Sequence, residues 1–498
     1  MAIAGAAGPA TGRDAVEVWL TITVLAADWA IRLTLAFRVV MRRRAVPVSL
    51  AWLVLLLFAP VVGAIAYLLV GETRVGAKRA RRYLDAGRDL EERAARFWRE
   101  GAQDWTAAGD TDEALRRLAT AYTGLPPLAG NRLTLLHETD AFLDAIIADL
   151  DAATHHAHLL FYIWQPDGRA LEVADAVERA ARRGVECRLL LDAVGSTAFL
   201  RSTRCALLRS AGVEVVAALP VNPVRALFER LDVRNHRKVV EIDGRIAYTG
   251  SHNLTDNTFR NPRRPHLGPW IDASVRVEGP GAQALGVIFL HDWQVESPRR
   301  IADIGEYMPD FGVIQAGSTV QAAPSGPGIA PDSIHNLLLT AIYAAREELI
   351  LTTPYFVPDE ALRNAMSAAA MRDVEVTLIV PRATDTPVVA MAARSHYQDL
   401  LDAGVRIALH SRGLLHSKIL TVDRRIAMIG SLNFDMRSFW LNFESTLVIH
   451  DDDFASVVRW LQREYMEECE VISRRAWAAR PVWKRAVDNT ARLLSPLL

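Results

Sequence analysis

The sequence is poor in cysteine: its 498 residues include only three, Cys187, Cys205 and Cys469. They are far apart and lack the close, paired spacing of zinc ligands or of a disulfide framework. We therefore expect three isolated thiols, buried or partly buried, with no structural metal and no cross-links. The length exceeds one ordinary core and predicts two or three domains.

A surplus of charge of one sign is also absent. Lys and Arg total 57 and Asp and Glu total 58, which gives a formal net charge of −1. The molecule as a whole is therefore not a polyanion binder, and any basic surface must be local. This balance argues against a nucleic acid as the partner.

Charge is missing altogether from residues 45–71. Within this run, Ser49–Val70 is long enough to cross about 30 Å of hydrocarbon as one helix. Trp52 and Tyr67 lie near its two ends, where amphipathic rings prefer to sit at a membrane surface, and Pro60 can kink it. We predict a transmembrane helix here.

An earlier apolar stretch, Val18–Met41, carries Asp28, Arg32 and Arg38. Asp28 and Arg32 are four residues apart and can pair on one helix face, which must then face a neighbouring helix. We predict a second transmembrane helix rather than a cleavable signal, because no basic start precedes the first apolar run. The alternative is a buried helical hairpin of a soluble protein.

The basic residues around these segments bear on orientation. A two-span hairpin places both of its ends on one side of the membrane. Six basic residues then lie at the ends, namely Arg13 and five between Arg74 and Arg82, against three in the loop Arg42–Arg44. The positive-inside rule favours a cytoplasmic catalytic portion by this small margin.

The rest of the chain alternates strand-like and helical segments, which predicts an α/β fold with a largely parallel or mixed sheet flanked by helices. The pattern occurs twice. FYIWQPDG near Tyr162 is followed by a helix and CRLLLD, and PYFVPDE near Tyr355 is followed by a helix and VTLIVP. Repetition at this long period indicates a duplicated domain, with Met308–Asp332 as the expected junction.

Each half carries the same motif, HxK(x)4D(x)6GSxN. The first copy comprises His236, Lys238, Asp243, Ser251 and Asn253, and the second comprises His416, Lys418, Asp423, Ser431 and Asn433. Six fixed positions recur by chance at roughly one in 10⁷ to 10⁸ starting points at average residue usage. Two copies in matching places are therefore not accidental.

The spacing suits phosphodiester chemistry. On a strand, a His and a Lys two residues apart project from the same face. Ammonium and amide groups stabilise the charged oxygens of a phosphoryl transition state, one histidine can attack phosphorus, and a second can protonate the leaving alkoxide. One histidine from each half would supply this pair.

Carboxylates are expected beside both histidines, because a catalytic imidazole usually needs its other nitrogen oriented. The candidates are Asp272 for His236 and Glu444 for His416, each downstream in the same half. Either can instead be a structural group. The same alternative applies to Asp243 and Asp423, which fall at a strand end and can hold the turn.

The paired motifs resemble those of the phospholipase D superfamily. Further phrases, AYLLVGE, NHRKVVEIDGRIAYTGSHN, TTPYFVP, GLLHSK and FDMRSFWLNFE, resemble two-span bacterial cardiolipin synthases over almost the whole chain. The resemblance implies an enzyme in the bacterial inner membrane. It would join two phosphatidylglycerols into cardiolipin and glycerol through a phosphatidyl-histidine, with no metal ion or other cofactor.

The resemblance assigns catalysis to His236, Lys238, Asp243, His416, Lys418 and Asp423, and phosphate binding to Ser251, Asn253, Ser431 and Asn433. The superfamily more often takes its nucleophile from the N-terminal motif, so His236 is the expected nucleophile and His416 the acid–base. No DGxxAR with spaced aspartates occurs, unlike the metal-dependent enzymes that make the same lipid.

The expected organisation follows from these segments: a tail (1–17), two membrane helices (18–71), a basic helical linker (72–130), two catalytic halves (131–315 and 316–475) and an amphipathic tail (476–498). The basic run Arg74–Arg82 would meet anionic headgroups. The end from Trp477 to Leu498 would lie on the membrane or pack on the catalytic core.

Three rival functions remain at this point. A phospholipase D hydrolase shares the covalent intermediate and would use water in place of the second lipid. A nuclease of the superfamily is disfavoured by the membrane segment and by the near-neutral charge. A non-catalytic scaffold would show the loss of a His or Lys, and both motifs are intact.

Overall fold

The computed structural model describes residues 12–42, 46–71, 110–221, 232–259, 265–299, 303–311, 316–328 and 332–493, with isolated residues between them. The chain forms two compact units. Unit 1 comprises residues 1–76 and 222–232, and unit 2 comprises residues 77–221 and 233–498.

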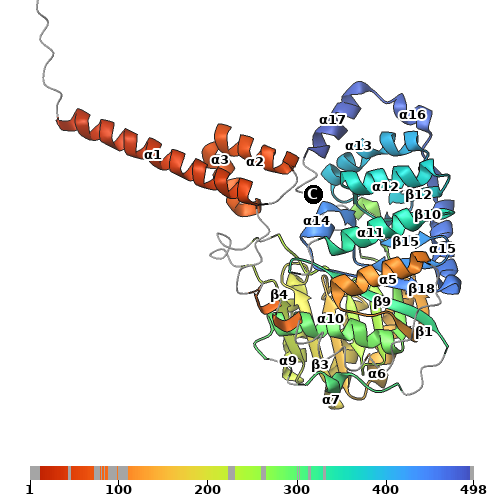
Figure 1. The fold of residues 1–498 in the computed structure, drawn as a ribbon. Coiled ribbons are helices and arrows are strands. Elements are labelled where there is room, and N and C mark those ends of the chain that lie inside the picture. Colours follow the sequence, from red (N-terminus) through yellow and green to blue (C-terminus); the bar gives the residue numbers. More distant parts are fainter. Residues whose placement is uncertain are drawn as a thin grey trace, which may run out of the picture. The chain divides into compact units, whose positions relative to one another are not determined.

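Unit 1 contains the helices α1 (Gly12–Met41), α2 (Val46–Phe58) and α3 (Pro60–Val70) (Figure 1). Within α1, the 26 residues Val16–Met41 are long and apolar enough to cross a membrane, as expected. Asp28 and Arg32 form the expected ion pair, at 2.5 Å between Oδ2 and Nη2.

The expected single helix over Ser49–Val70 is wrong. The segment breaks at Ala59, because Pro60 has no N–H to continue the hydrogen-bonding of α2 and instead begins α3. The ring centroids of Trp52 and Tyr67 lie 5.3 Å apart and pack edge to face. In one straight helix they would be about 22 Å apart, so α2 and α3 form a hairpin instead.

Unit 2 holds both repeats. The first half consists of β1 (Leu128–Leu136), α6 (Thr139–Ala152), β2 (His156–Phe161), α7 (Ala170–Arg182), β3 (Glu186–Asp192), α8 (Thr197–Leu200), α9 (Thr203–Ser210), β4 (Glu214–Ala218), β5 (Val239–Ile242), β6 (Ile246–Gly250), β7 (Trp270–Ile271), β8 (Ser274–Glu278) and α10 (Pro280–Glu296).

The second half repeats this order. It consists of β9 (Ser318–Ser325), α11 (Ser333–Ala344), β10 (Glu348–Thr352), β11 (Phe356–Val357), α12 (Glu360–Met371), β12 (Glu375–Pro381), α13 (Pro387–Ala403), β13 (Arg406–His410), β14 (Leu414–Leu415), β15 (Ile419–Val422), β16 (Ile426–Gly430), β17 (Phe434–Asp435), α14 (Met436–Trp440), β18 (Glu444–His450), α15 (Asp452–Glu467) and β19 (Cys469–Val471).

The strand order confirms the duplication. The first half has the order β1-β8-β6-β5-β2-β3-β4, and the second has β9-β18-β16-β15-β10-β12-β13, with β19 added at the edge. β2, β3 and β4 are mutually parallel, as are β10, β12 and β13, whereas β5 and β15 run antiparallel to their neighbours. The mixed sheet is thus the predicted α/β fold, present twice.

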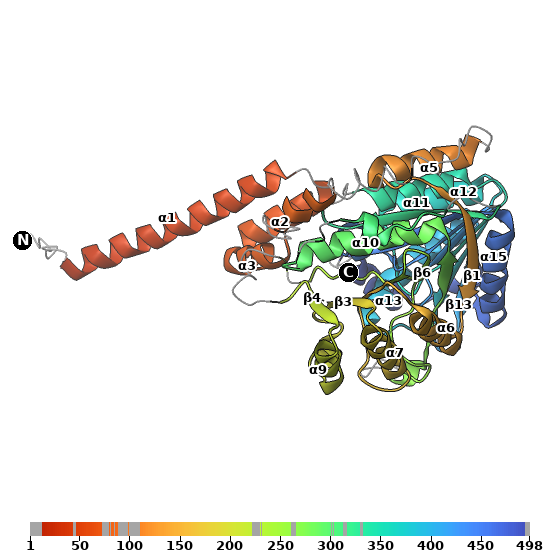
Figure 2. The ribbon, with the colours of Figure 1, turned by 90° about the horizontal axis from the view of Figure 1, so that it is seen from below.

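Three hydrophobic cores stack through unit 2. One lies between the first-half strands and α6, α7 and α9, and another between the second-half strands and α11, α12 and α13. The third lies between the two sets of strands and includes α10 and α15. In Figure 1, helices α6, α7 and α9 lie at the bottom and helices α11, α12 and α13 lie at the top. Figure 2 views the same layers from below. The two halves therefore share a core.

Each motif lies on a hairpin of this shared core. β5 and β6 are joined at Asp243 and Gly244, and β15 and β16 at Asp423 and Arg424, and all four residues have positive φ. The motif His and Lys were expected on the strands, but β5 begins at Val239 and β15 at Ile419. His236–Lys238 and His416–Lys418 instead precede the strands, because their backbone N–H groups are used in contacts described below.

The segments that flank the halves also pack on unit 2. α5 (Asp110–Thr123), from the expected linker, contributes Leu115 and Ala119 to the second-half core. Near the C-terminus, α17 (Val482–Arg492) packs on α13 through Asp488, which bonds Arg394, so the packing alternative is confirmed. Residues 494–498 lie outside the described residues, as do Arg74 and Lys78 of the basic run. Arg79 of this run pairs with Glu296 at 2.9 Å.

Candidate active site

Both motif histidines line one cavity of about 640 Å³ in unit 2. The cavity has contributions from both halves, and most of its lining is polar or aromatic. The lining residues are Tyr162, Ile163, Gln165, Gly195, Arg234, His236, Asn253, Phe259, Trp270, Tyr355, Asp385, Thr386, Val389, His416, Asn433, Asp435, Arg437 and Asn442. The duplication therefore builds one site, not two.

His236 is held by the second half. Its backbone N–H donates to the carbonyl of Phe443 at 2.9 Å. Its Nδ1 lies 3.0 Å from Oε2 of Glu444, and Ser431 donates its hydroxyl to the same carboxylate. Since Nδ1 is occupied, Nε2 is the nitrogen left for chemistry.

His416 is held by the first half in the same way. Its backbone N–H donates to the carbonyl of Ile271 at 2.8 Å, where β14 pairs with β7. Its Nδ1 lies 2.7 Å from Oδ1 of Asp272, and its Nε2 lies 2.9 Å from Nζ of Lys418. Trp270 packs against the imidazole, with 4.2 Å between ring centroids.

Both orienting carboxylates were expected from the sequence, but their assignment to histidines of the same half is wrong. Asp272 of the first half bonds His416, and Glu444 of the second half bonds His236. The reason is backbone pairing across the interface between halves. The residues that accept the histidine N–H groups, Ile271 and Phe443, directly precede the two carboxylates.

Burial sets the protonation of these groups. It lowers the pKa of His236, and burial together with Lys418 lowers that of His416 to about 4. Burial alone would raise the pKa values of Asp272 and Glu444, but their histidine partners outweigh it, so both values lie below the ordinary range. Both carboxylates are therefore ionised beside neutral imidazoles at neutral pH.

The two lysines are buried in the same site. Burial lowers the pKa of Lys238 to about 8 and that of Lys418 to about 7. Their ammonium groups donate to the carbonyls of His236 and His416, respectively. Two buried ammonium groups beside the cavity favour an anionic ligand, which would restore their charge.

The serines and asparagines of the motifs separate into two groups. Asn253 and Asn433 line the cavity, and Nδ2 of Asn253 is buried with no hydrogen-bond partner among the described residues. Ser251 and Ser431 do not line it. Their hydroxyls accept from the N–H groups of Ala273 and Ser445, next to the two orienting carboxylates. The expected phosphate role is thus corrected for the serines, which position the carboxylate segments.

The motif aspartates lie at the far end of their strands. The carboxylate of Asp243 accepts from the N–H groups of Thr154, His155 and His156, and that of Asp423 accepts from Arg346, Glu347 and Glu348. Neither lines the cavity. The geometry corrects the catalytic assignment in favour of the turn-holding alternative, because both carboxylates are occupied by backbone donors.

The chain is similar to known proteins over most of its length. A sequence model of the family described as "Cardiolipin synthase, PLD-like domain" matches residues 146–263 and 338–465, and "Phospholipase_D-nuclease N-terminal" matches residues 30–72. A curated cardiolipin synthase A of Erwinia tasmaniensis is 44% identical over 481 residues, which cover 94% of this chain and 97% of that protein. Cardiolipin synthase A of Serratia proteamaculans is 42% identical over 488 residues, with the same coverage of both chains.

The chain belongs to the cardiolipin synthase family. A solved structure, phosphatidylserine synthase of Haemophilus influenzae, superimposes with a TM-score of 0.56 at 16% identity and covers 78% of this chain and 100% of that one. This likeness agrees with the fold described above.

Sequence reasoning missed Arg237, the residue between His236 and Lys238 in this cardiolipin synthase family member. Its guanidinium is fully buried and pairs with Asp292. It also donates from Nε to the backbone carbonyl of Glu444 at 3.0 Å and from Nη2 to the hydroxyl of Tyr83 at 3.2 Å. Arg237 therefore ties the juxtamembrane segment and α10 to the carboxylate that orients His236.

Two tyrosines of the cavity were also missed, although the repeat contained the signal. Tyr162 and Tyr355 occupy matching places in FYIWQPDG and PYFVPDE, and both line the cavity. The ring of Tyr162 lies 5.0 Å from that of His236 and 5.5 Å from Nζ of Lys238. Tyr355 donates to Asp385 at 2.7 Å.

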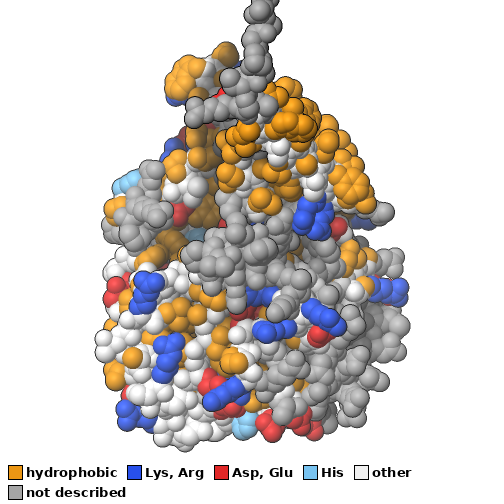
Figure 3. All heavy atoms as spheres, turned by 90° about the vertical axis from the view of Figure 1, so that its left-hand side faces the viewer, with side chains coloured by type: hydrophobic (Ala, Val, Ile, Leu, Met, Phe, Trp, Pro, Cys, Tyr) orange, Lys and Arg blue, Asp and Glu red, His pale blue; other side chains and the backbone are white. Residues whose placement is uncertain are grey.

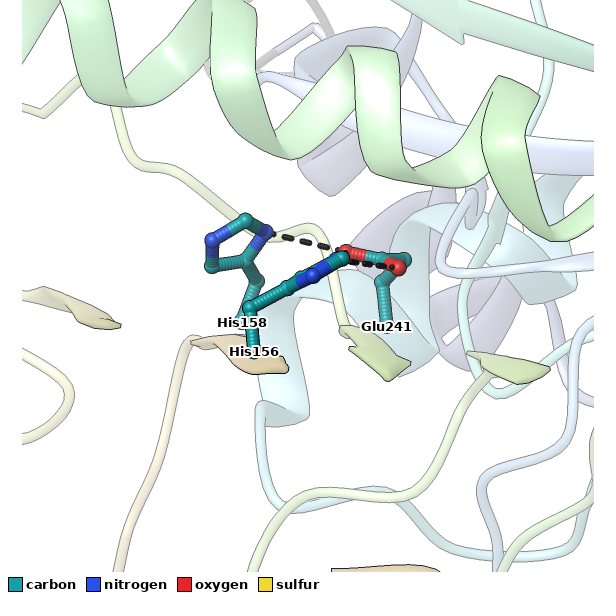
Figure 4. A group of neighbouring side chains, drawn as sticks. All are labelled: His156, His158 and Glu241. Atoms are coloured by element: carbon teal, nitrogen blue, oxygen red, sulfur yellow. Dashed lines mark hydrogen bonds and ion pairs between the residues drawn. The ribbon is translucent and has the colours of Figure 1, made fainter. Parts of the chain in front are cut away.

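Within the described part of the chain, one group of side chains is compact enough to hold a metal ion: His156, His158 and Glu241 (Figure 4). It lies under α10, away from the cavity. Both histidines bond Glu241 at 2.9 Å, and the guanidinium of Arg188 lies 3.1 Å from Nε2 of His158. The adjacent cation and the filled ligand atoms make this a buried hydrogen-bond network.

The crossed pairing predicts which histidine each carboxylate affects. Asp272→Asn should move the Nδ1 proton resonance of His416 and leave that of His236 in place, and Glu444→Gln should do the reverse, because each substitution weakens one charge-assisted hydrogen bond. Histidine-labelled protein in detergent, studied by ¹H–¹⁵N NMR, provides the measurement. A shift confined to the histidine of the same half would contradict the crossed geometry.

The motif aspartates should act on stability and not on chemistry. Asp243→Ala leaves three backbone N–H groups without their acceptor, so we expect a loss of about 2–4 kcal/mol in the free energy of unfolding and near-normal turnover by the folded fraction. Asp423→Ala is the matched variant in the other half. Thermal unfolding and turnover per folded molecule check this, and loss of turnover at unchanged stability would restore a catalytic role.

Proposed function

We propose that this cardiolipin synthase family member transfers a phosphatidyl group from one phosphatidylglycerol to another, giving cardiolipin and glycerol. The observation that carries the proposal is the single cavity lined by two histidines, each oriented by a carboxylate of the opposite half. A buried lysine lies against each histidine. The two curated relatives are both named cardiolipin synthase A, and the chain aligns with 97% of the length of each.

In the first step, Nε2 of His236 attacks the phosphorus of phosphatidylglycerol. A P–N bond forms and the bond from phosphorus to the glycerol headgroup oxygen breaks. Glu444 stabilises the cationic imidazole that results, since it accepts a hydrogen bond from Nδ1. His416, oriented by Asp272, takes up a proton at Nε2 when the anionic substrate binds and gives this proton to the departing glycerol oxygen.

In the second step, a second phosphatidylglycerol replaces glycerol. Its terminal hydroxyl gives its proton to His416, and the hydroxyl oxygen attacks phosphorus as the P–N bond to His236 breaks. This leaves His236 free and His416 protonated, so the enzyme is regenerated. The same steps can run backward, which makes the transfer reversible. Water in place of the second lipid would give hydrolysis.

The lysines and asparagines take the electrostatic role in both steps. Lys418 bonds Nε2 of His416. A phosphodiester anion would draw this ammonium toward itself and raise the pKa of His416, which prepares the imidazole as an acid. Nδ2 of Asn253 supplies a further donor, buried with no hydrogen-bond partner among the described residues.

The lipid substrates imply membrane contact by both units, and the bacterial inner membrane is the proposed location. The exposed surface of α17 includes Val482, Trp483 and Val487, with Lys484 and Arg485 adjacent in the sequence. Apolar and basic side chains on one short helix suit an anionic membrane surface. We propose that this face contacts headgroups while Asp488 holds the helix on the catalytic unit.

Product analysis on phosphatidylglycerol vesicles tests the function. The purified protein should form cardiolipin and glycerol in equal amounts, also in the presence of a strong chelator, since the proposed charges come from Lys238 and Lys418. Phosphatidic acid plus glycerol as the main products would identify a hydrolase instead. Activity lost with chelator and restored by magnesium would contradict the metal-free mechanism.

The two histidines should differ in a trapping experiment. His236→Ala and His416→Ala should each abolish cardiolipin formation, because nucleophile and acid act as one unit. An activated phosphatidyl ester needs little acid help, so it should still phosphorylate His236 in His416→Ala and then stall. Mass spectrometry should locate the acid-labile adduct on His236 in that variant and find none in His236→Ala; the reverse would exchange the roles.

The lysines predict a pH dependence of lipid binding. With pKa values of about 8 and about 7, Lys238 and Lys418 lose their charge in the free enzyme as pH rises past these values. Binding of a non-hydrolysable phosphonate analogue of phosphatidylglycerol should therefore weaken above pH 8, by up to about tenfold per pH unit for each lysine.

Calorimetric titration between pH 6 and 9.5 measures this effect. Lys418→Arg is the matched control, because a guanidinium stays charged over the whole range and should leave only the decline that is due to Lys238. Affinity that does not change with pH in the unsubstituted protein would contradict the electrostatic role of the lysines.

A further inference from the structure

The tip of the α2–α3 hairpin meets α1 at a polar contact. Pro60 leaves the last carbonyl groups of α2 without intrahelical partners, and Nη1 of Arg32 donates to one of them, the carbonyl of Leu57, at 2.9 Å. Nη2 of the same guanidinium pairs with Asp28. Two ionisable side chains from the middle of α1 thus satisfy the backbone where α2 is interrupted.

This contact fixes how far the hairpin reaches along α1. From Arg32 to Met41 is nine residues, or about 14 Å of helix, which is about half of a 30 Å hydrocarbon layer. Leu35 and Val39, in this part of α1, are buried with Leu56 and Tyr67 of the hairpin. The hairpin therefore accompanies only the C-terminal part of α1, and the part before Asp28 continues without it.

Neither arm of the hairpin can cross a membrane. α2 has 13 residues and α3 has 11, and apolar helices of this length are typical of re-entrant or buried segments. Close packing holds the arms together: a Cβ on Gly63 would lie 2.5 Å from the carbonyl oxygen of Leu55. A side chain at this position would force the arms apart.

The turn itself is apolar. Phe58, Val61 and Val62 are 83%, 68% and 66% exposed, respectively. In Figure 3, hydrophobic side chains gather in the upper part of the face, at the height of α1–α3 in Figure 1. A turn in water would carry Gly, Asn, Asp or Ser, whereas this tip offers only hydrocarbon surface, so a lipid leaflet is the partner that it suits.

We propose that unit 1 crosses the membrane once, through α1, and that α2–α3 is a re-entrant hairpin in the leaflet on the C-terminal side of α1. Non-helical backbone at membrane depth must have its polar groups satisfied by protein, and Arg32 provides this at Leu57. The N-terminus and the catalytic unit then lie on opposite sides of the membrane, contrary to a two-span hairpin.

The distribution of charge supports the single crossing independently. With one crossing, Arg42–Arg44 and the five basic residues between Arg74 and Arg82 lie on the same side, eight against Arg13 alone. A two-span hairpin gives six against three. The positive-inside rule then places the catalytic unit in the cytoplasm by a wide margin.

Cysteine accessibility distinguishes the two topologies. In a Cys469→Ser background, whose remaining Cys187 and Cys205 are buried, single cysteines are introduced as Arg43→Cys and Glu72→Cys, before and after the hairpin. Intact and permeabilised spheroplasts are treated with a membrane-impermeant maleimide. We expect both positions to be labelled only after permeabilisation.

Two further variants complete the experiment. Ala7→Cys should be labelled in intact spheroplasts, because a single crossing places the N-terminus opposite the cytoplasmic catalytic unit, whereas a two-span hairpin would place both in the cytoplasm. Phe58→Cys at the tip should resist labelling from both sides. Arg43→Cys and Glu72→Cys on opposite sides, or a water-accessible Phe58→Cys, would overturn the proposal. None of these positions belongs to the catalytic site, so a failure of the proposed activity would leave the labelling pattern unchanged.

Discussion

The backbone pairing between the two halves is the interaction on which the site depends. Phe443 accepts the N–H of His236, and Ile271 accepts the N–H of His416. Each contact brings the next residue of its own half, Glu444 or Asp272, to Nδ1 of the partner histidine. Separation of the halves would remove the orienting carboxylate from both histidines at once, which gives a physical reason for one chain with two copies of the motif.

The same interface explains the electrostatics. Burial of both lysines and both histidines at the interface between the halves lowers their pKa values. The ammonium groups therefore lose their charge more readily than an exposed lysine does, and an anionic phosphodiester would favour their charged form. Arg237 extends this arrangement outward, because it bonds both Glu444 and Tyr83 of the juxtamembrane segment.

In unit 1, burial away from water has a comparable consequence for polar groups. A buried polar group needs a partner wherever water is absent, and Arg32 satisfies the carbonyl of Leu57 as Ser431 satisfies Glu444 in the catalytic site. In both places a polar side chain in an apolar sequence environment is explained only by the segment that folds onto it.

The sequence by itself determined the parts that are local or repeated. The motif residues, the α/β duplication, the apolar α1 and the Asp28–Arg32 pair all follow from spacing, because spacing fixes which side chains share a helix face or a strand end. What it could not determine depends on distant chain segments. Asp272 was assigned to the wrong histidine, Asp243 to the catalytic groups, and Ser49–Val70 to one helix. Only the tertiary structure decided these, since the choice of partner lies in packing between residues up to 208 positions apart, which no local pattern encodes.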